Sequence, residues 1–168
     1  PLFPKDYRND VTLNNLVLSV DPECSPELTA MLGSAIATAV SDIPFAGPCA
    51  MTQIGMIDGE FIVNPGQNQY KGSDLKLTVA STREKVIMIE AGANEIPEAK
   101  MIEAIYLAHE VNQQVIAFID KIVAECGKEK HTYTSCAVPE ELFEAIKEQV
   151  PPEEMEKAVF TDEKQVRE

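Results

Sequence analysis

A periodic stretch in the second half of the chain constrains the fold more than any other feature. From Met101 onward, residues of one face recur at alternating steps of four and three, which is the spacing of an α-helix. The recurring positions are Met101, Ile105, Ala108, Asn112, Val115, Ile119 and Ile122, and Ile102, Tyr106, His109, Ile116 and Val123 widen the stripe. The pattern predicts one uninterrupted helix from about Pro97 to Cys126, ended by Gly127. Because the stripe is wide, we expect this helix to cover a sheet, with Ile105, Val115 and Ile119 buried.

The residues before this helix follow the two-residue period of β-strands. Strands are expected over 50–56, 61–63, 75–79 and 86–89. Asp58-Gly59 separates the first two strands and predicts a tight hairpin, in which glycine takes the positive φ that the turn requires. The run Val86-Ile87-Met88-Ile89 is continuously apolar, which favours a strand that is covered on both faces.

The N-terminal part predicts one more strand and a helix. Apolar residues alternate over 11–20 with a change of phase at Asn14-Asn15, which is typical of a strand with a bulge. Ser25 followed by Pro26 is a helix start, and a helix is expected from about Pro26 to Ser41. The order strand, helix, four strands and long helix predicts an α/β fold, an α+β sandwich.

Composition changes after the long helix. The segment 127–135 is polar, whereas 139–149 and 152–160 are short and amphipathic, so we expect a linker followed by a small all-α segment. Residues 1–128 and 129–168 are therefore the predicted domains. The second is strongly acidic, with ten acidic and four basic residues from Cys136 to Glu168.

Charge and hydropathy exclude several classes of protein. The 168-residue chain carries a formal net charge of −14, which excludes a basic clamp for nucleic acid, although a local basic patch stays compatible with it. No apolar run approaches the roughly 20 residues of a membrane span, and the first residues do not resemble a signal peptide. The four cysteines form no CxxC pair and are expected to be reduced thiols, so we expect a cytoplasmic protein without membrane contact.

Four carboxylates on or beside the predicted strands are candidates for chemistry. Asp58, Glu60, Asp74 and Glu90 could converge on a divalent metal ion or share acid and base duties. Structural explanations are stronger for three of them, because Asp58 suits a hairpin turn, Glu60 an exposed strand and Asp74 the start of a strand. Glu90 follows four apolar residues, where a carboxylate without a partner is costly, so its role is either catalytic or that of a hydrogen-bonded structural acid.

The other candidate groups do not complete an active site. His109 lacks the second histidine of an HExxH motif and is interpreted as a packed or boundary residue, and His131 stands alone in the polar linker. The segment 92–94, Gly-Ala-Asn, is either a phosphate-binding nest or a turn. Lys5 and Arg8 could touch a phosphate, but the acidic residues beside them favour a solvated surface.

Seven stretches in order resemble the bacterial polynucleotide phosphorylase family across nearly the whole chain. They are PLFPKDYRNDV, VLSVDPECSPEL, SDIPFAGPCA, IDGEFIVNP, SDLKLTVAST, VIMIEAGANEIPE and VPEELFEAI. The resemblance implies a phosphate-dependent 3′–5′ exoribonuclease, a nucleotidyltransferase that acts in RNA degradation, with two ribonuclease PH-like cores and a helical domain between them. It places residues 1–128 as the second half of the first core and the remainder as the start of the helical domain.

The resemblance also implies partners, cofactors and site residues. The family uses single-stranded RNA, inorganic phosphate and Mg²⁺ and forms a homotrimer. In the stretch SDLKLTVAST, Lys76 stands where the family's catalytic core has a metal-binding aspartate, and Thr78 stands where it has the catalytic lysine. Asn64-Pro65-Gly66 also departs from the family's usual NPT. These departures agree with the non-catalytic first core, so no catalytic, cofactor-binding or metal-binding residue is assigned to this chain, and Mg²⁺ is expected to bind elsewhere in the full-length protein.

Two other classes of function compete with this interpretation. The chain could be a stand-alone acidic protein-interaction module, with the sheet as scaffold and the helical tail as docking element. It could also be a small metal-dependent hydrolase that uses Asp58, Asp74 and Glu90, which would require these three carboxylates to converge.

Overall fold

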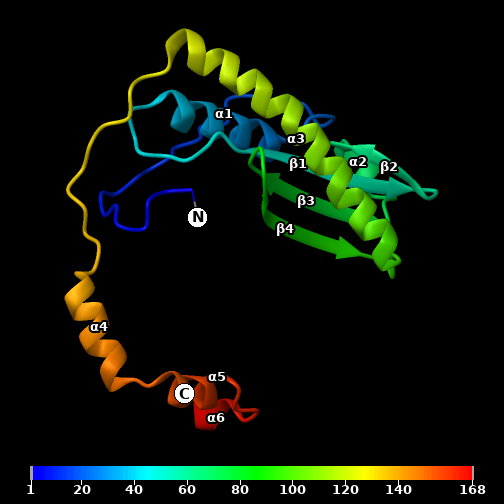
Figure 1. The fold of residues 1–168 in the computed structure, drawn as a ribbon. Coiled ribbons are helices and arrows are strands. Elements are labelled where there is room, and N and C mark those ends of the chain that lie inside the picture. The colour runs from blue at the N-terminus through cyan, green and yellow to red at the C-terminus, as the bar shows by residue number, and fades with distance from the viewer. Residues whose placement is uncertain (1, 168) are drawn as a thin grey trace. The chain divides into compact units, whose positions relative to one another are not determined.

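The protein consists of two compact units, which we describe separately. The computed structural model describes residues 2–167 (Figure 1). The larger unit contains the residues up to Lys5 and Asn9–Tyr133, and the smaller contains Asp6–Arg8 and the chain from Thr134 onward.

The larger unit is built on a four-stranded antiparallel sheet. Its strands are β1 (Ala50–Ile57), β2 (Glu60–Val63), β3 (Leu75–Ser81) and β4 (Val86–Ala93), in the order β2-β1-β3-β4. The predicted hairpin is confirmed, because β1 and β2 meet at Asp58 (φ 52°) and Gly59 (φ 81°). Two consecutive residues with positive φ give the turn a twist that matches its strands.

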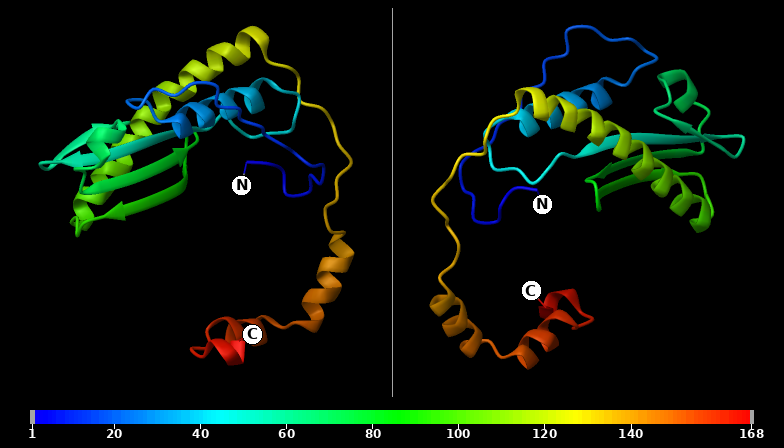
Figure 2. Two further views of the ribbon diagram at one scale, coloured as in Figure 1. Left: turned by 180° about the vertical axis from the view of Figure 1, so that it is seen from behind. Right: turned by 45° about the horizontal axis from the view of Figure 1, so that its top comes forward.

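One long helix covers one face of this sheet. The predicted helix is confirmed as α3 (Glu98–Cys126), which lies across β1 and β3 (Figure 2). Apolar side chains that alternate along these two strands pack on Ala104 and Ala108 of α3, whose small side chains allow close approach. The packed strand residues are Ile54, Met56, Leu75, Leu77 and Val79. Ile119 is buried as expected, whereas Ile105 and Val115 are only half-buried.

A buried polar residue fixes α3 on the sheet. Asn112 is fully buried, and its side-chain oxygen accepts a hydrogen bond of 2.8 Å from the Thr52 hydroxyl. Its amide nitrogen donates to the Val79 carbonyl at 3.1 Å and to the Ser81 hydroxyl at 2.9 Å. The amide therefore joins β1 and β3 to α3, and each of these buried polar groups has a partner.

The predicted first helix is confirmed as α1 (Pro26–Val40). The Ser25 hydroxyl accepts a hydrogen bond of 3.2 Å from the Leu28 amide, and proline occupies the first turn. Ala35 and Ala39 bury their side chains in a second cluster with Cys49 and Ile119. This cluster connects α1 to the C-terminal half of α3.

The chain after α3 is held at the end of α1. The Lys130 ammonium donates to the carbonyls of Thr38, Ala39 and Ser41 at 3.2, 2.9 and 2.6 Å. The amides of Lys128 and His131 donate to the carbonyls of Val40 and Asp42. The cation thus satisfies carbonyls that a helix C-terminus leaves without intrahelical partners.

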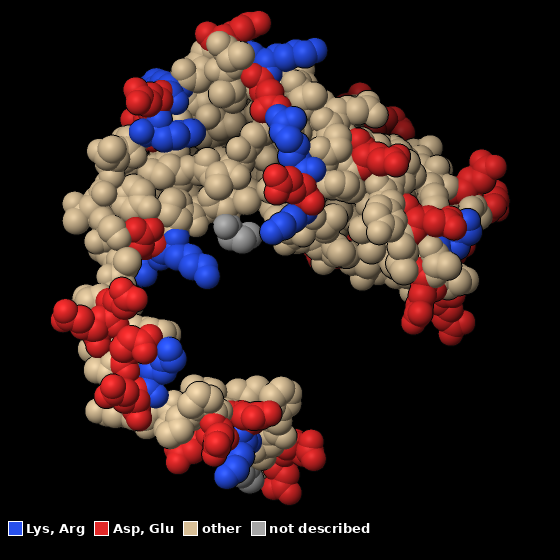
Figure 3. All heavy atoms as spheres, in the orientation of Figure 1, with Lys and Arg blue, Asp and Glu red and all other residues tan. Residues whose placement is uncertain are grey.

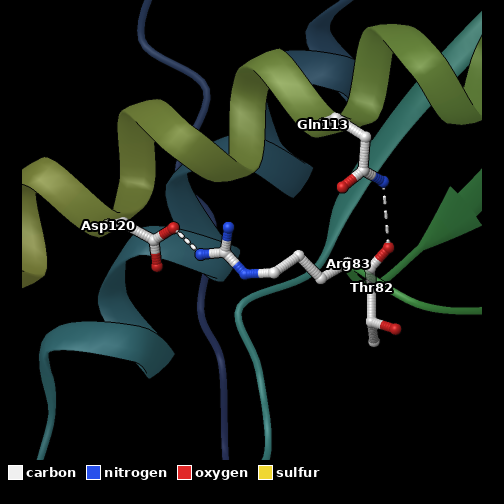
Figure 4. A network of polar contacts seen from close by, with 4 residues as sticks. All are labelled: Thr82, Arg83, Gln113 and Asp120. Carbon is white, nitrogen blue, oxygen red and sulfur yellow. Dashed lines mark hydrogen bonds and ion pairs between the residues drawn. The ribbon is translucent and has the colours of Figure 1, made fainter.

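The β3–β4 turn is fastened to α3 from outside the core. Figure 4 shows Arg83 reaching toward Asp120, with which it forms an ion pair, and Gln113 reaching toward the turn. The Gln113 side-chain amide donates to the Thr82 carbonyl at 3.2 Å. Because the Arg83 and Asp120 side chains are 59% and 36% exposed, their ion pair contributes at most about 1 kcal/mol.

Two sequence predictions about strands are wrong. Residues 11–20 form no strand, and Leu16 and Leu18 are 83% and 87% exposed. A strand requires a neighbour for its backbone groups, and no described segment pairs with this one. The run 86–89 does form a strand, but β4 is the edge of the sheet and its side chains are largely exposed instead of covered on both faces.

The smaller unit contains three short helices. They are α4 (Glu140–Gln149), α5 (Pro152–Val159) and α6 (Lys164–Arg167), so the expected all-α tail is present. Apolar side chains on α4 and α5 are exposed, including Phe143 and Met155. Figure 3 shows acidic side chains over both helices. The domain boundary between residues 128 and 129 stays a prediction.

Candidate functional site

The open face of the sheet carries a row of three polar side chains. Residues Leu75, Leu77 and Val79 point toward α3, so Lys76 and Thr78 between them point to the opposite face. Thr78 lies directly opposite Gln53 of β1 on one side and Glu90 of β4 on the other. An amide, a hydroxyl and a carboxylate are thus neighbours across three strands, with Cβ atoms about 5 Å apart.

This row forms the floor of a cavity of about 760 Å³. The wall opposite the sheet is the segment from Val20 to Glu27, which contains the start of α1. A side wall comes from Pro65 and from the short helix α2 (Gln67–Tyr70). The volume lies within the range of small-molecule sites.

Two polar groups of this cavity are buried without a partner. Gln53 is 9% exposed, and neither its side-chain oxygen Oε1 nor the Tyr70 hydroxyl has a hydrogen-bond partner among the described residues. The Gln53 backbone, in contrast, has two partners. Its backbone N–H donates to Asn64 Oδ1 at 3.0 Å, and its backbone carbonyl accepts from the Asn64 backbone N–H at 2.7 Å. An unpaired buried polar group is costly, so these two atoms require an explanation beyond folding.

The charged groups of the cavity influence one another. Lys76 Nζ lies 5.3 Å from the centroid of the Tyr70 ring, a cation–π distance. Burial, and secondly the Glu27 carboxylate, raise the pKa of Tyr70 to about 12. The pKa of Glu27 is lowered mainly by a hydrogen bond of 2.6 Å that its carboxylate accepts from the Ser25 hydroxyl, and Lys76 makes a smaller contribution. The tyrosine is therefore a neutral hydrogen-bonding group at physiological pH, and Glu27 is an anion.

The four carboxylates proposed from the sequence do not converge. Asp58 lies in the β1–β2 turn, and Asp74 precedes β3 at the same end of the sheet, where its amide donates to the Met56 carbonyl. Glu90 pairs with Thr78 of β3. Thr78 lies four residues beyond Asp74, so Glu90 is about 13 Å from Asp74 along the strand direction. Glu60 is exposed on β2 and does not line the cavity.

The positions of these carboxylates test the hypothesis that they bind a metal ion together. The described residues contain no group of three His, Cys, Asp or Glu side chains that could hold a metal ion. Lys76 in the cavity offers no lone pair to a cation and repels it. The donor set of the described residues therefore does not fit a Mg²⁺ site. The separation of Asp58, Asp74 and Glu90 excludes the hydrolase that would use them. Glu90 itself is exposed, so the expectation of a costly buried carboxylate was wrong.

The remaining candidates have local structural explanations. His109 is half-buried on α3, with the Gln113 amide nitrogen 3.4 Å from its ring nitrogens. The His131 amide is engaged at the end of α1. In the segment 92–94, Gly92 and Ala93 end β4, and the Asn94 amide, in the bend that follows, donates to the Asp74 carbonyl at 2.9 Å, so this segment is a strand end and a bend instead of a nest. Lys5 and Arg8 belong to different units.

Sequence reasoning missed Gln53 and Tyr70, and it placed Asn112 in the stripe of the long helix without recognising its hydrogen-bonding role. Asn112 stands alone as an amide in the apolar stripe of α3, and this signal was available in the sequence. Gln53 and Tyr70 gave no such signal, because their contact with Lys76 and Thr78 arises from strand pairing and from the position of α2.

Comparison with known proteins defines the class to which this fold belongs. Residues 47–111, which contain the whole sheet, match the model of domain 2 of the 3′ exoribonuclease family. The crystal structure of rice (Oryza sativa) Rrp46 has a TM-score of 0.55 over 62% of this chain and 51% of that chain, at 13% identity, which shows a common fold. The larger unit is thus a ribonuclease PH-like domain, as the sequence predicted.

Curated relatives identify the family within this class. A polyribonucleotide nucleotidyltransferase of Lachnoclostridium phytofermentans is 76% identical over all 168 residues. Those of Ruminiclostridium cellulolyticum and Bacillus velezensis are 47% and 45% identical over 99% and 100% of the chain. The chain belongs to the polyribonucleotide nucleotidyltransferase family, whose name denotes a transferase, and this confirms the resemblance stated above. It spans about a quarter, 24%, of the length of these relatives.

The structure also bears on membrane association. No helix among the residues that the structure describes is long and apolar enough to cross a membrane.

Proposed function

We propose that this chain is a non-catalytic, structural part of a phosphate-dependent 3′–5′ exoribonuclease, which releases nucleoside diphosphates in RNA degradation. In this proposal, residues 1–128 are the second half of the first ribonuclease PH-like core, and residues 129–168 begin the helical domain. RNA, phosphate and Mg²⁺ bind elsewhere in a longer, cytoplasmic, trimeric protein. The chain matches only 24% of the length of its relatives, which leaves most of such a protein to other segments.

The observation that carries the non-catalytic role is the chemistry of β3. Phosphorolysis requires charge on the scissile phosphate to be neutralised, commonly by a metal ion and by cationic donors. At the two β3 positions where the resemblance implies a metal-binding aspartate and a catalytic lysine, this chain carries Lys76 and Thr78. An ammonium does not hold a divalent cation, and a hydroxyl does not replace a cationic donor.

The exposed apolar residues support a structural role. Leu13, Leu16, Val17, Leu18 and Val20 are between 48% and 87% exposed in a segment that has no partner strand among the described residues. Together with α1 this segment lines a cavity of about 620 Å³. Contiguous exposed apolar surface of this kind marks an interface, here with another part of the longer protein.

The acidic protein-interaction module is the runner-up. The apolar faces of α4 and α5, exposed and surrounded by carboxylates, are the observation that favours it. The two proposals differ in what must flank this chain, because only the first requires a second ribonuclease PH-like core in the same coding sequence.

The test uses the longer protein that contains this chain. Lys76→Ala and Thr78→Ala should leave the rate of phosphate-dependent release of nucleoside diphosphates within about twofold of the unchanged protein, since neither side chain takes part in the reaction. A loss of two orders of magnitude or more in a folded variant would place catalysis in this chain and overturn the proposal. Coding sequence without a second core would favour the interaction module.

A further inference from the structure

We propose that the cavity above β1, β3 and β4 is a binding site for an uncharged ribonucleoside, in which Glu90 accepts hydrogen bonds from the ribose hydroxyls and Gln53 binds the base. This inference concerns the chain's own ligand and does not rest on the proposed structural role. It starts from two buried polar atoms that folding leaves without partners, Gln53 Oε1 and the Tyr70 hydroxyl.

The position of Gln53 points to a ligand. Its side chain lines the cavity, although the residue is 91% buried, so a partner for its unpaired Oε1 must enter through the cavity. A side-chain amide donates and accepts at the same time, which matches the polar edge of a nucleobase. The Tyr70 hydroxyl stays protonated, because its pKa is about 12, and offers a second donor and acceptor nearby.

The row across the sheet provides the sugar contacts. The exposed Glu90 carboxylate has no hydrogen bond or ion pair among the described residues. Thr78 places a hydroxyl between Glu90 and Gln53. A carboxylate accepts from two neighbouring hydroxyls at once, which is how acidic residues bind ribose in other nucleotide sites. Gly92, beside Lys76 at the cavity lining, leaves open space, since a Cβ there would meet no atom within 4 Å.

Charge and ligand chemistry disfavour phosphate-bearing ligands and metal ions. The charged residues that line the cavity are three acidic ones, Asp21, Glu27 and Glu90, and one basic one, Lys76. This negative lining would repel a polyphosphate or an RNA backbone. A metal ion finds no group of three His, Cys, Asp or Glu side chains among the described residues, and the ammonium of Lys76, which lies over the Tyr70 ring, repels it. An uncharged ligand rich in hydroxyl and amide groups satisfies the free atoms without opposing either charge.

The direct experiment is a titration of the 168-residue chain with adenosine, followed by amide chemical shifts in ¹H–¹⁵N NMR spectra. Saturable shifts should be confined to cavity amides such as those of Gln53, Thr78 and Gly92. Because one hydrogen bond to a carboxylate is lost, 2′-deoxyadenosine should bind about tenfold more weakly. Inorganic phosphate and spermidine serve as the charged comparison ligands and should produce no shifts in the cavity.

Two variants and a matched control complete the test. Glu90→Gln should weaken adenosine about tenfold. Gly92→Leu should abolish binding by placing a side chain in the cavity, at a position where the added Cβ meets no atom within 4 Å. Glu60→Gln removes another exposed strand carboxylate, outside the cavity, and should change nothing.

The inference would be overturned by any of three results. These are no saturable shift at about 10 mM adenosine, equal binding of adenosine and 2′-deoxyadenosine, or shifts that persist in Gly92→Leu. None of these results bears on the release of nucleoside diphosphates, so the proposed structural role is tested separately.

Discussion

At the scale of single residues, Asn112 is the most consequential polar side chain of the core. It connects the hydroxyls of Thr52 and Ser81 and the carbonyl of Val79 to α3. Asn112→Ala would leave these buried groups without partners, and the free energy of unfolding should fall by about 2 to 4 kcal/mol. Urea denaturation followed by circular dichroism measures this change. The exposed Gln114→Ala on the same helix is the control, and equal midpoints for the two variants would show that the network contributes nothing.

Thiol reactivity reports on burial at the same scale. Cys49 is buried, and burial raises the pKa of its thiol, whereas Cys24, Cys126 and Cys136 are exposed. Since the thiolate is the reactive form, three thiols should react rapidly with Ellman's reagent at pH 8, and one should react only as the protein unfolds. Cys49→Ala should remove the slow phase alone. Four equally fast thiols in the folded chain would contradict the packing of Cys49 between α1 and α3.

At the scale of elements, stability should differ between the two units. Helix α3 buries five residues in the core, whereas α4 and α5 bury none. Amide protons of α3 around Ala108 and Ile116 should therefore exchange much more slowly than those of α4 and α5. Hydrogen exchange measured by NMR tests this expectation. Equal protection of α3 and α4 would show that the tail has a packed core of its own.

The elements also show what the sequence could predict and why the rest was out of reach. Helices α1 and α3 and the β1–β2 hairpin carry local signals, namely caps, a 3.6-residue period and Asp58-Gly59, and all were predicted. The strand expected over 11–20 and the coverage of β4 depend on neighbours, which local periodicity does not report. For the same reason the cavity was missed, because the row of Gln53, Thr78 and Glu90 exists only through strand register.

At the scale of the whole molecule, charge governs contact with RNA. Lys and Arg contacts to phosphates supply most of the non-specific affinity for nucleic acids, and this chain has a net charge of −14. Fluorescence anisotropy with a short single-stranded RNA should show negligible binding at moderate salt. Salt-sensitive binding in the micromolar range would contradict this expectation, and its loss in Lys5→Ala or Arg8→Ala would locate a basic patch that the average charge conceals.

The central claim is that this chain supports a phosphorolytic enzyme without performing its chemistry. The most direct measurement incubates the purified chain with single-stranded RNA, inorganic phosphate and Mg²⁺ and quantifies nucleoside diphosphates. We predict no release above a protein-free control, because β3 carries Lys76 and Thr78, and because Asp58, Asp74 and Glu90 do not form a metal site. Release that requires phosphate, follows the protein through purification and disappears in Asp74→Asn or Glu90→Gln would contradict the account.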